Sequence, residues 1–275
     1  MSLSLAHLQV LKRQTGARAL AASQIATASR RPDSDIHRLR QLLRLRQPHR
    51  VYPSAGPEDR TLPGMEVAPG LRLIEALLPA ESLPARISGE FDRRESLDPC
   101  RVLFFDTETT GLTRGTGTRA FMIGAAHWRN GLLHVRQLLL TTLAAEKTML
   151  EVFSGWLAKD TVLASYNGKS YDAPLLRTRY RLARMLDPTA PLEHVDLLYP
   201  SRRRYRGIYK NCRLATIERQ ELKIIREDDL PGSEAPTAWL TYLRGGSAQN
   251  LRRVALHNQQ DVVSLSRLLM HLCAV

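Results

Sequence analysis

Two carboxylates stand two residues apart in the segment FFDTETTGL, from Phe104 to Leu112. Asp106 and Glu108 follow the apolar run 102–105, which is typical of a buried strand. Because alternate residues of a strand point to the same face, both acids are expected to project together. No Lys or Arg lies between Val102 and Thr113 to neutralise them. A hard divalent cation is the natural partner of such a pair, and a solvated acidic tip on an edge strand is the alternative.

A third acid, Asp172, lies in the segment YNGKSYDAPLL, 166–176. It marks the expected start of a helix, with Pro174 in the first turn, where proline is tolerated. The alternative role for this aspartate is an ordinary helix N-cap. The run 168–170, Gly-Lys-Ser, does not complete a phosphate-binding loop, because that motif needs a glycine where Leu163 stands.

The last acid of interest lies in HNQQDVVSL, 257–265. His257 and Asp261 are four residues apart, so they share one face of the helix expected over 250–272. A surface ion pair between the two side chains is the alternative interpretation. Apolar residues along the same segment indicate that the helix packs broadly on the core.

The order of these motifs resembles that of the DEDD exonucleases, which have a ribonuclease H-like fold. Within them, the chain is most similar to the YprB-like ribonuclease H-like domain proteins, over roughly 98–275. Further segments agree with that subgroup: GTGTRAFMIG (115–124), RQLLL (136–140), HVDLL (194–198), NCRLATIE (211–218) and REDDLPG (226–232).

This resemblance implies a two-metal phosphodiesterase that removes nucleotides from the 3′ end of DNA or RNA. Four carboxylates are expected to hold two Mg²⁺ or Mn²⁺ ions, and their charge offsets the +4 of the ions. His257 is expected to orient or deprotonate the attacking water. The expected metal ligands, which also count as catalytic residues, are Asp106, Glu108, Asp172 and Asp261.

Three further residues match positions at which the family contacts its substrate: Thr109, Gly111 and Asn167. One spacing departs from the family. In the histidine branch the imidazole lies five residues before the last aspartate, whereas His257 lies four before Asp261, the interval of the tyrosine branch. One residue rotates a helical side chain by about 100°, so His257 approaches the water differently.

The elements expected around these motifs give an α/β protein with a mixed central sheet flanked by helices. A hairpin is expected where Arg-Asn-Gly separates two apolar runs. Asp196 is expected to make a structural hydrogen bond, and 227–229 to form a solvated loop. The strands are expected over 101–105, 120–128, 132–139, 161–165 and 195–198, and the helices over 146–157, 173–185, 213–222, 237–243 and 250–272.

Composition separates the first part of the chain from the rest. Residues 1–97 are basic and rich in proline, which favours an extended, partly disordered accessory region with room for short strands; 98–275 form the expected catalytic domain. Ten Lys/Arg against two Asp/Glu in 1–50 suit nucleic acid, as do the basic residues and tyrosines of 199–213. Solvated faces are the alternative for both clusters. The 275 residues carry a net charge of +13.

The sequence predicts a cytoplasmic protein with no membrane span and no disulfide framework among its three cysteines. Its expected partner is nucleic acid, and single-stranded 3′ ends in particular. Two other functions remain open at this point: a nucleic-acid-binding module that has lost catalysis, and an endonuclease on the same scaffold. The retention of all four carboxylates argues against the inactive module.

Overall fold

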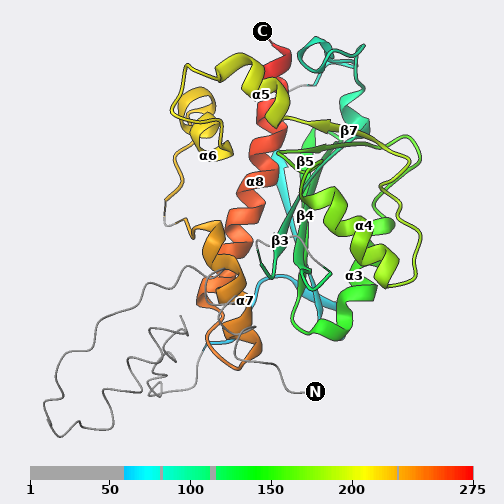
Figure 1. Cartoon of the computed structure of the whole chain (residues 1–275), viewed down its shortest axis with the longest axis vertical. Helices are drawn as coiled ribbons and strands as arrows, with labels where there is room; N and C mark the ends of the chain where they lie inside the picture. Colours follow the sequence, from blue (N-terminus) through cyan, green and yellow to red (C-terminus); the bar gives the residue numbers. More distant parts are fainter. Residues whose placement is uncertain (1–58, 81–82, 112–115, 228, 275) are drawn as a thin grey trace, which may run out of the picture. The chain divides into compact units, whose positions relative to one another are not determined.

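The computed structural model describes residues 59–80, 83–111, 116–227 and 229–274. The chain divides into two compact units, Met1–Pro53 and Ser54–Val275, and every described residue belongs to the second. A seven-stranded mixed sheet in the order β1-β2-β5-β4-β3-β6-β7 organises this unit (Figure 1). Its strands are β1 (Met65–Ala68), β2 (Leu71–Pro79), β3 (Val102–Thr109), β4 (Ala120–Arg129), β5 (Leu132–Leu140), β6 (Val162–Ser165) and β7 (Glu193–Asp196).

The sheet changes direction at β3. On one side, β3 pairs antiparallel with β4, and the antiparallel pairing continues through β5, β2 and β1. On the other side, β3 pairs parallel with β6, and β6 with β7. The carboxyl ends of the three parallel strands therefore meet at one edge, where loops in such sheets carry functional groups.

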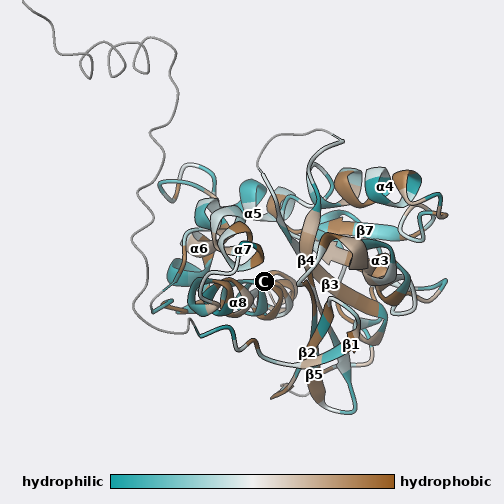
Figure 2. Ribbon diagram, turned by 90° about the horizontal axis from the view of Figure 1, so that it is seen from below, coloured by the Kyte–Doolittle hydropathy of each residue, from teal (hydrophilic) through white to brown (hydrophobic). Residues whose placement is uncertain are grey.

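Helices cover both faces of the sheet (Figure 2). The long helix α8 lies with α5, α6 and α7 on one side, and α3 and α4 lie on the other. None of the described helices has an apolar stretch long enough to cross a membrane. The helix bounds are α3 (Glu146–Ser154), α4 (Asp172–Leu182), α5 (Leu198–Tyr205), α6 (Leu214–Ile217), the short π-helix η4 (Glu218–Leu222), α7 (Ala235–Leu243) and α8 (Gln249–Cys273), with 3₁₀ turns η1 (Glu90–Asp92), η2 (Pro99–Arg101), η3 (Leu143–Ala145) and η5 (Gly232–Glu234).

The alternation of side chains along β3 divides the core between these two layers. Phe104 packs in a buried cluster with Val262 of α8, whereas Phe105 packs in a second cluster with Phe153 of α3. Both phenylalanines are fully buried. Since residues two apart share a face, Asp106 follows Phe104 onto the α8 side of the sheet.

Most of the expected elements are present, with shifted ends. The first strand continues past residue 105 to Thr109, so both acids lie within β3 itself. The hairpin of β4 and β5 is confirmed, with Asn130 and Gly131 both at positive φ in its turn. The prediction of a strand at 195–198 was wrong at its end, because Leu198 already begins α5. The sequence also did not locate β1 and β2, so the sheet takes two strands from the proline-rich region before residue 98.

Candidate active site

Asp106 and Glu108 lie in the carboxyl-terminal half of β3 and face α8. Glu108 is only 8% exposed, which excludes the solvated acidic tip considered as the alternative. Burial raises the pKa of Asp106 well above its usual range, and repulsion from Asp261, Asp172 and Glu108 raises it further. Burial also raises the pKa of Glu108, with repulsion from Asp261 and Asp172 as the next causes. The fold therefore gathers these acids at a cost in free energy.

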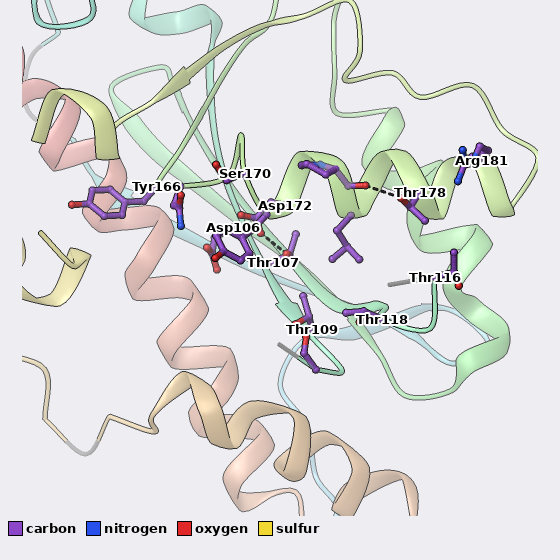
Figure 3. A pocket seen from close by; sticks show the side chains of 15 residues that line it. Asp106, Thr107, Thr109, Thr116, Thr118, Tyr166, Ser170, Asp172, Thr178 and Arg181 are labelled. Atoms are coloured by element: carbon purple, nitrogen blue, oxygen red, sulfur yellow. Dashed lines mark hydrogen bonds between the residues drawn. The ribbon is translucent and has the colours of Figure 1, made fainter. Parts of the chain in front are cut away.

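Asp172 begins α4, after the loop 166–171 that follows the carboxyl end of β6. It is not the cap of this helix, because Tyr171 occupies the capping position. Its Oδ1 instead accepts a hydrogen bond from the Thr107 hydroxyl. Burial raises the pKa of Asp172 to about 6, although the bond from Thr107 opposes this change. Figure 3 shows Asp106 and Thr107 on the strand next to Asp172, with the hydrogen bond from Thr107 to Asp172 dashed.

Asp261 reaches the same place from α8, and an arginine accompanies it. Burial raises the pKa of Asp261, while the Arg226 guanidinium opposes the change. Arg226 donates to Asp261 Oδ1 and, through Nε at 2.8 Å and Nη2 at 2.5 Å, to both oxygens of Glu218. Glu218 is almost fully buried, so it fixes the guanidinium firmly. Neither Arg226 nor Glu218 was expected from the sequence to belong to the site.

A row of residues across three strands ties α8 to the sheet beside Asp106. Asp106 pairs with Gly124 of β4, and Gly124 pairs with Gln137 of β5. Asn258 of α8 lies over this row, donates to Asp106 Oδ2 at 3.0 Å and accepts from Gln137 Nε2 at 2.9 Å. A Cβ on Gly124 would lie 2.0 Å from Asn258 Oδ1. The glycine therefore permits the close approach of helix and strand that these hydrogen bonds require.

His257 lies beside Asp261, with its Nε2 3.4 Å from Asp261 Oδ2. The two side chains do contact each other, but they are only 18% and 15% exposed, so this is not the exposed surface pair considered as the alternative. On the other edge of the ring, Nδ1 lies 2.5 Å from Asp229 Oδ1 and 3.2 Å from Arg226 Nη1. Asp229 lies in an exposed loop, as expected for 227–229, but the sequence did not indicate its contacts with His257 and Arg226; Asp228 lies outside the described residues.

The four acids suit a divalent cation by their chemistry. Carboxylate oxygens are the ligands that Mg²⁺ and Mn²⁺ prefer, and mutual repulsion in a buried place is what a dication relieves. However, among the described residues no three His, Cys, Asp or Glu side chains are arranged as a ready ligand set. Three acids instead accept hydrogen bonds from neighbouring donors. These pairs are Asp106 with Asn258, Asp172 with Thr107 and Asp261 with Arg226.

A cavity of about 720 Å³ opens over this edge of the sheet (Figure 3). Asp106 and Asp172 line it together with all three residues expected to contact substrate: Thr109, Gly111 and Asn167. The Thr109 hydroxyl donates to the Gly111 carbonyl at 2.9 Å, which shapes the loop after β3. His257 lines a different cavity, of about 930 Å³, with Arg226 and Asp229.

Two expectations outside the acid cluster have different outcomes. Asp196 is fully buried and accepts from the backbone N–H of Asn167 at 2.6 Å and of Lys169 at 3.1 Å, which confirms its structural role. In the basic stretch 199–213, Tyr205 is only 3% exposed and stacks on Tyr209, so this ring does not offer its face to a base. The basic cluster within 1–50 lies outside the described residues.

Comparison with known proteins places this arrangement in a family. A family model described as the RNase_H superfamily matches residues 103–273. The uncharacterized protein YprB of Bacillus subtilis (strain 168) is 36% identical over 172 residues, which are 62% of this chain and 41% of that protein. The chain thus spans less than half the length of this curated relative.

Several solved structures are also similar. The family B DNA polymerase of Pyrobaculum calidifontis has a TM-score of 0.47 at 16% identity, over 62% of this chain and 24% of the polymerase. The EXO domain of Aedes aegypti Nibbler has a TM-score of 0.42 at 17% identity, over 63% of this chain and 82% of that domain's chain. E. coli exonuclease I in complex with a dT13 oligonucleotide has a TM-score of 0.38 at 16% identity, over 56% of this chain and 43% of the exonuclease.

The mixed sheet flanked by helices has the ribonuclease H-like fold expected from the motifs. The family match includes all five expected catalytic residues, from β3 to α8. Because this match spans more than half of its length, the chain belongs to the RNase_H superfamily.

Proposed function

We propose that this chain is a metal-dependent 3′–5′ exonuclease that hydrolyses phosphodiester bonds of DNA or RNA. One observation carries the proposal: three distant segments bring four carboxylates into a buried place where they repel one another. Burial and this repulsion raise the pKa of Asp106 and of Glu108. A fold that needed these acids only for packing would gain stability from neutral side chains there.

Asp106, Glu108, Asp172 and Asp261 would hold the cations, with Mg²⁺ or Mn²⁺ as the candidates and two ions as the family number. The cations, when bound, would supply charge stabilisation for a displacement at phosphorus. Arg226 keeps the Asp261 carboxylate at the cluster, and Asn258 does the same for Asp106. His257 would take the proton of the attacking water, since its Nε2 faces the same side as Asp261.

The cavity beside Asp106 and Asp172 is the proposed position of the terminal nucleotide. Its walls carry hydroxyl, amide and aromatic groups, including Thr109, Asn167 and Tyr166. Hydroxyl and amide groups suit sugar and phosphate oxygens, and an aromatic ring suits a base. Single-stranded 3′ ends are the substrate that we propose for this lining. We also propose that residues 98–275, completed by β1 and β2, form the catalytic domain and that the preceding basic region is accessory.

A degradation assay with labelled strands tests the proposal. Linear and circular single strands of one sequence, as DNA and as RNA, are incubated with Mg²⁺, Mn²⁺ or a chelator. We expect shortening of linear strands from the 3′ end, no cleavage of circles and no reaction with chelator. Asp106→Asn should lower the rate by about 10³-fold or more, because it removes a ligand of the reacting centre. Glu151→Gln, on the exposed face of α3, is the matched control and should react like the wild type.

Each contrary result has a defined meaning. Cleavage of circular strands would show that the chain is an endonuclease and not an exonuclease. If single strands bind but are not cleaved under any of these conditions, the chain is an inactive nucleic-acid-binding module. Equal activity of Asp106→Asn and wild type would reject the carboxylate cluster as the catalytic centre.

A further inference from the structure

We propose that Asp229 is the positioning acid of His257: it accepts the Nδ1 proton and so leaves the Nε2 lone pair facing Asp261. This inference rests on the proposed function, because it gives His257 its place in that reaction. It assigns a role to a residue that the motif pattern left in a loop. The geometry that carries it lies on both edges of one imidazole ring.

The first step concerns the Nδ1 edge of the ring. Asp229 Oδ1 lies 2.5 Å from Nδ1, and Arg226 Nη1 lies 3.2 Å from the same atom. A guanidinium only donates hydrogen bonds and a carboxylate only accepts them. Arg226 therefore favours an unprotonated Nδ1, whereas Asp229 favours a protonated Nδ1. Because the carboxylate is much closer, Nδ1 carries the proton and donates to Asp229. The neutral ring is then the Nδ1–H tautomer, and its Nε2 is an acceptor.

The second step concerns the Nε2 edge. Nε2 lies 3.4 Å from Asp261 Oδ2, so two acceptors face each other across this gap. A group that brings a proton, such as a water molecule, is favoured beside such a pair. A general base needs this arrangement, because it must present a lone pair where the water proton is to be taken. Asp229 thus acts through His257 and does not contact the reacting atoms in the proposed reaction.

The third step concerns how Asp229 is held. It lies on the segment between η4 and α7, and its Oδ2 is 3.7 Å from Arg226 Nη1. Arg226 is itself fixed by Glu218, so the same segment holds His257 through Asp229 and Asp261 through Arg226. The residues Arg226 and Asp229 are three apart, and their partners on α8 are four apart. This double contact offers a reason why His257 can act as the base although it lies four residues before Asp261: the Asp229 carboxylate fixes the orientation of the ring independently of its position on the helix.

Nuclear magnetic resonance of the imidazole nitrogens tests the tautomer directly, without metal and without substrate. The full-length chain is labelled with ¹⁵N at its eight histidines, and His257→Gln assigns the His257 signals. At mildly alkaline pH we expect a protonated Nδ1 and a bare Nε2 in the wild type. In Asp229→Ala, Arg226 becomes the nearest partner of Nδ1, so the proton should move to Nε2. Glu227→Ala, two residues earlier and exposed, should leave the tautomer unchanged.

Kinetics give the second measurement. Asp229→Ala should lower kcat on a single-stranded 3′ end by about 10²-fold, the scale of a general base, with KM and the apparent affinity for Mg²⁺ changed less than about twofold. Asp229→Asn keeps an acceptor oxygen and should recover part of kcat. Glu227→Ala should keep the wild-type rate.

The outcomes separate this inference from the proposed function. A wild-type Nε2–H tautomer, or an unchanged tautomer in Asp229→Ala, overturns the role of Asp229 even if the chain degrades nucleic acid. An unchanged kcat in Asp229→Ala also overturns its catalytic contribution. If the tautomer moves as expected but no strand is degraded by any variant, the proposed function fails while the hydrogen bond to His257 stands.

Discussion

Two groups of buried charges in this protein are built in opposite ways. Glu146 of α3 is 8% exposed and meets two arginines: Arg179 Nε and Nη2 donate to it at 2.5 and 2.7 Å, and Arg119 Nη1 at 2.5 Å. At the other group, Asp261 is the one of the four described carboxylates that is bonded to an arginine, and that arginine, Arg226, is also bonded to Glu218.

The difference teaches how to separate structural acids from functional ones. A buried carboxylate that is fully paired serves the fold: Arg179, held by Glu146, also donates to the Thr116 carbonyl at 2.8 Å and so anchors the loop before β4. Carboxylates that raise one another's pKa are poor at that task and are suited to an added cation. Three predictions test this contrast, from the largest expected effect to the smallest.

Loss of Glu146 should have the largest effect on stability. Glu146→Ala leaves the Arg179 guanidinium, whose side chain is 6% exposed, without its carboxylate. We expect the free energy of unfolding to fall by about 3–5 kcal/mol, measured by urea denaturation. Glu151→Ala on the same helix removes only an exposed pair with Lys147 at 3.7 Å and should change it by less than about 1 kcal/mol. Equal effects of the two variants would show that the buried, paired Glu146 contributes no more to stability than the exposed Glu151.

Addition of a divalent cation should have the next largest effect, and only through the four clustered acids. Mg²⁺ or Mn²⁺ at about 100 times its Kd should stabilise the wild type by about 2.7 kcal/mol, because only the folded chain gathers the ligands. In chelator, Asp106→Asn should be more stable than the wild type, since it removes one repelling charge, and it should gain little from the cation. Thermal unfolding with and without the cation measures both effects. A cation response that survives in Asp106→Asn would place the ions elsewhere.

The smallest effect is a pH dependence of the cation-free protein. Asp172 has a folded pKa of about 6 against an ordinary 3.8, so its contribution to stability is complete below pH 3.8 and is lost as the pH rises through about 6. Asp172→Asn keeps an acceptor for Thr107 but has no such loss. The stability of the variant relative to wild type should therefore increase by about 1–3 kcal/mol between pH 4 and pH 6–7.

His194 titrates in the opposite sense in this range, because burial lowers its pKa to about 4. This contribution is common to both proteins and cancels in their difference. A flat difference between Asp172→Asn and wild type across the range would show that Asp172 is not strained by its surroundings.

Much of the site was predictable because it follows local patterns. The period of two along β3 indicated that Asp106 and Glu108 share a face, and the i,i+4 spacing indicated the same for His257 and Asp261. The hairpin of β4 and β5 was predictable from its Gly-containing turn. Such features depend on residues that are close in sequence, so they can be predicted from one sequence.

The missed features depend on contacts between distant segments. Arg226 and Asp229 lie in a run of charges that is typical of an exposed loop, and only the fold brings this run against α8. The segment REDDLPG gave a signal by its resemblance to the family, but not the partners of its side chains. Short strands were allowed for in the proline-rich region, but β1 and β2 were not located, because charged residues interrupt their apolar residues and leave no long apolar run to mark them.

Gly124 shows that a side chain can matter by being absent. It adds no side-chain group to the site, yet Asn258 occupies the volume that a methyl group would need. An enlarged residue there would act as a wedge between β4 and α8, and α8 carries His257 and Asp261 as well as Asn258. Two of the five proposed catalytic residues would move with this helix away from Asp106. The spacing between α8 and the strand that carries Asp106 thus depends on the missing Cβ of Gly124.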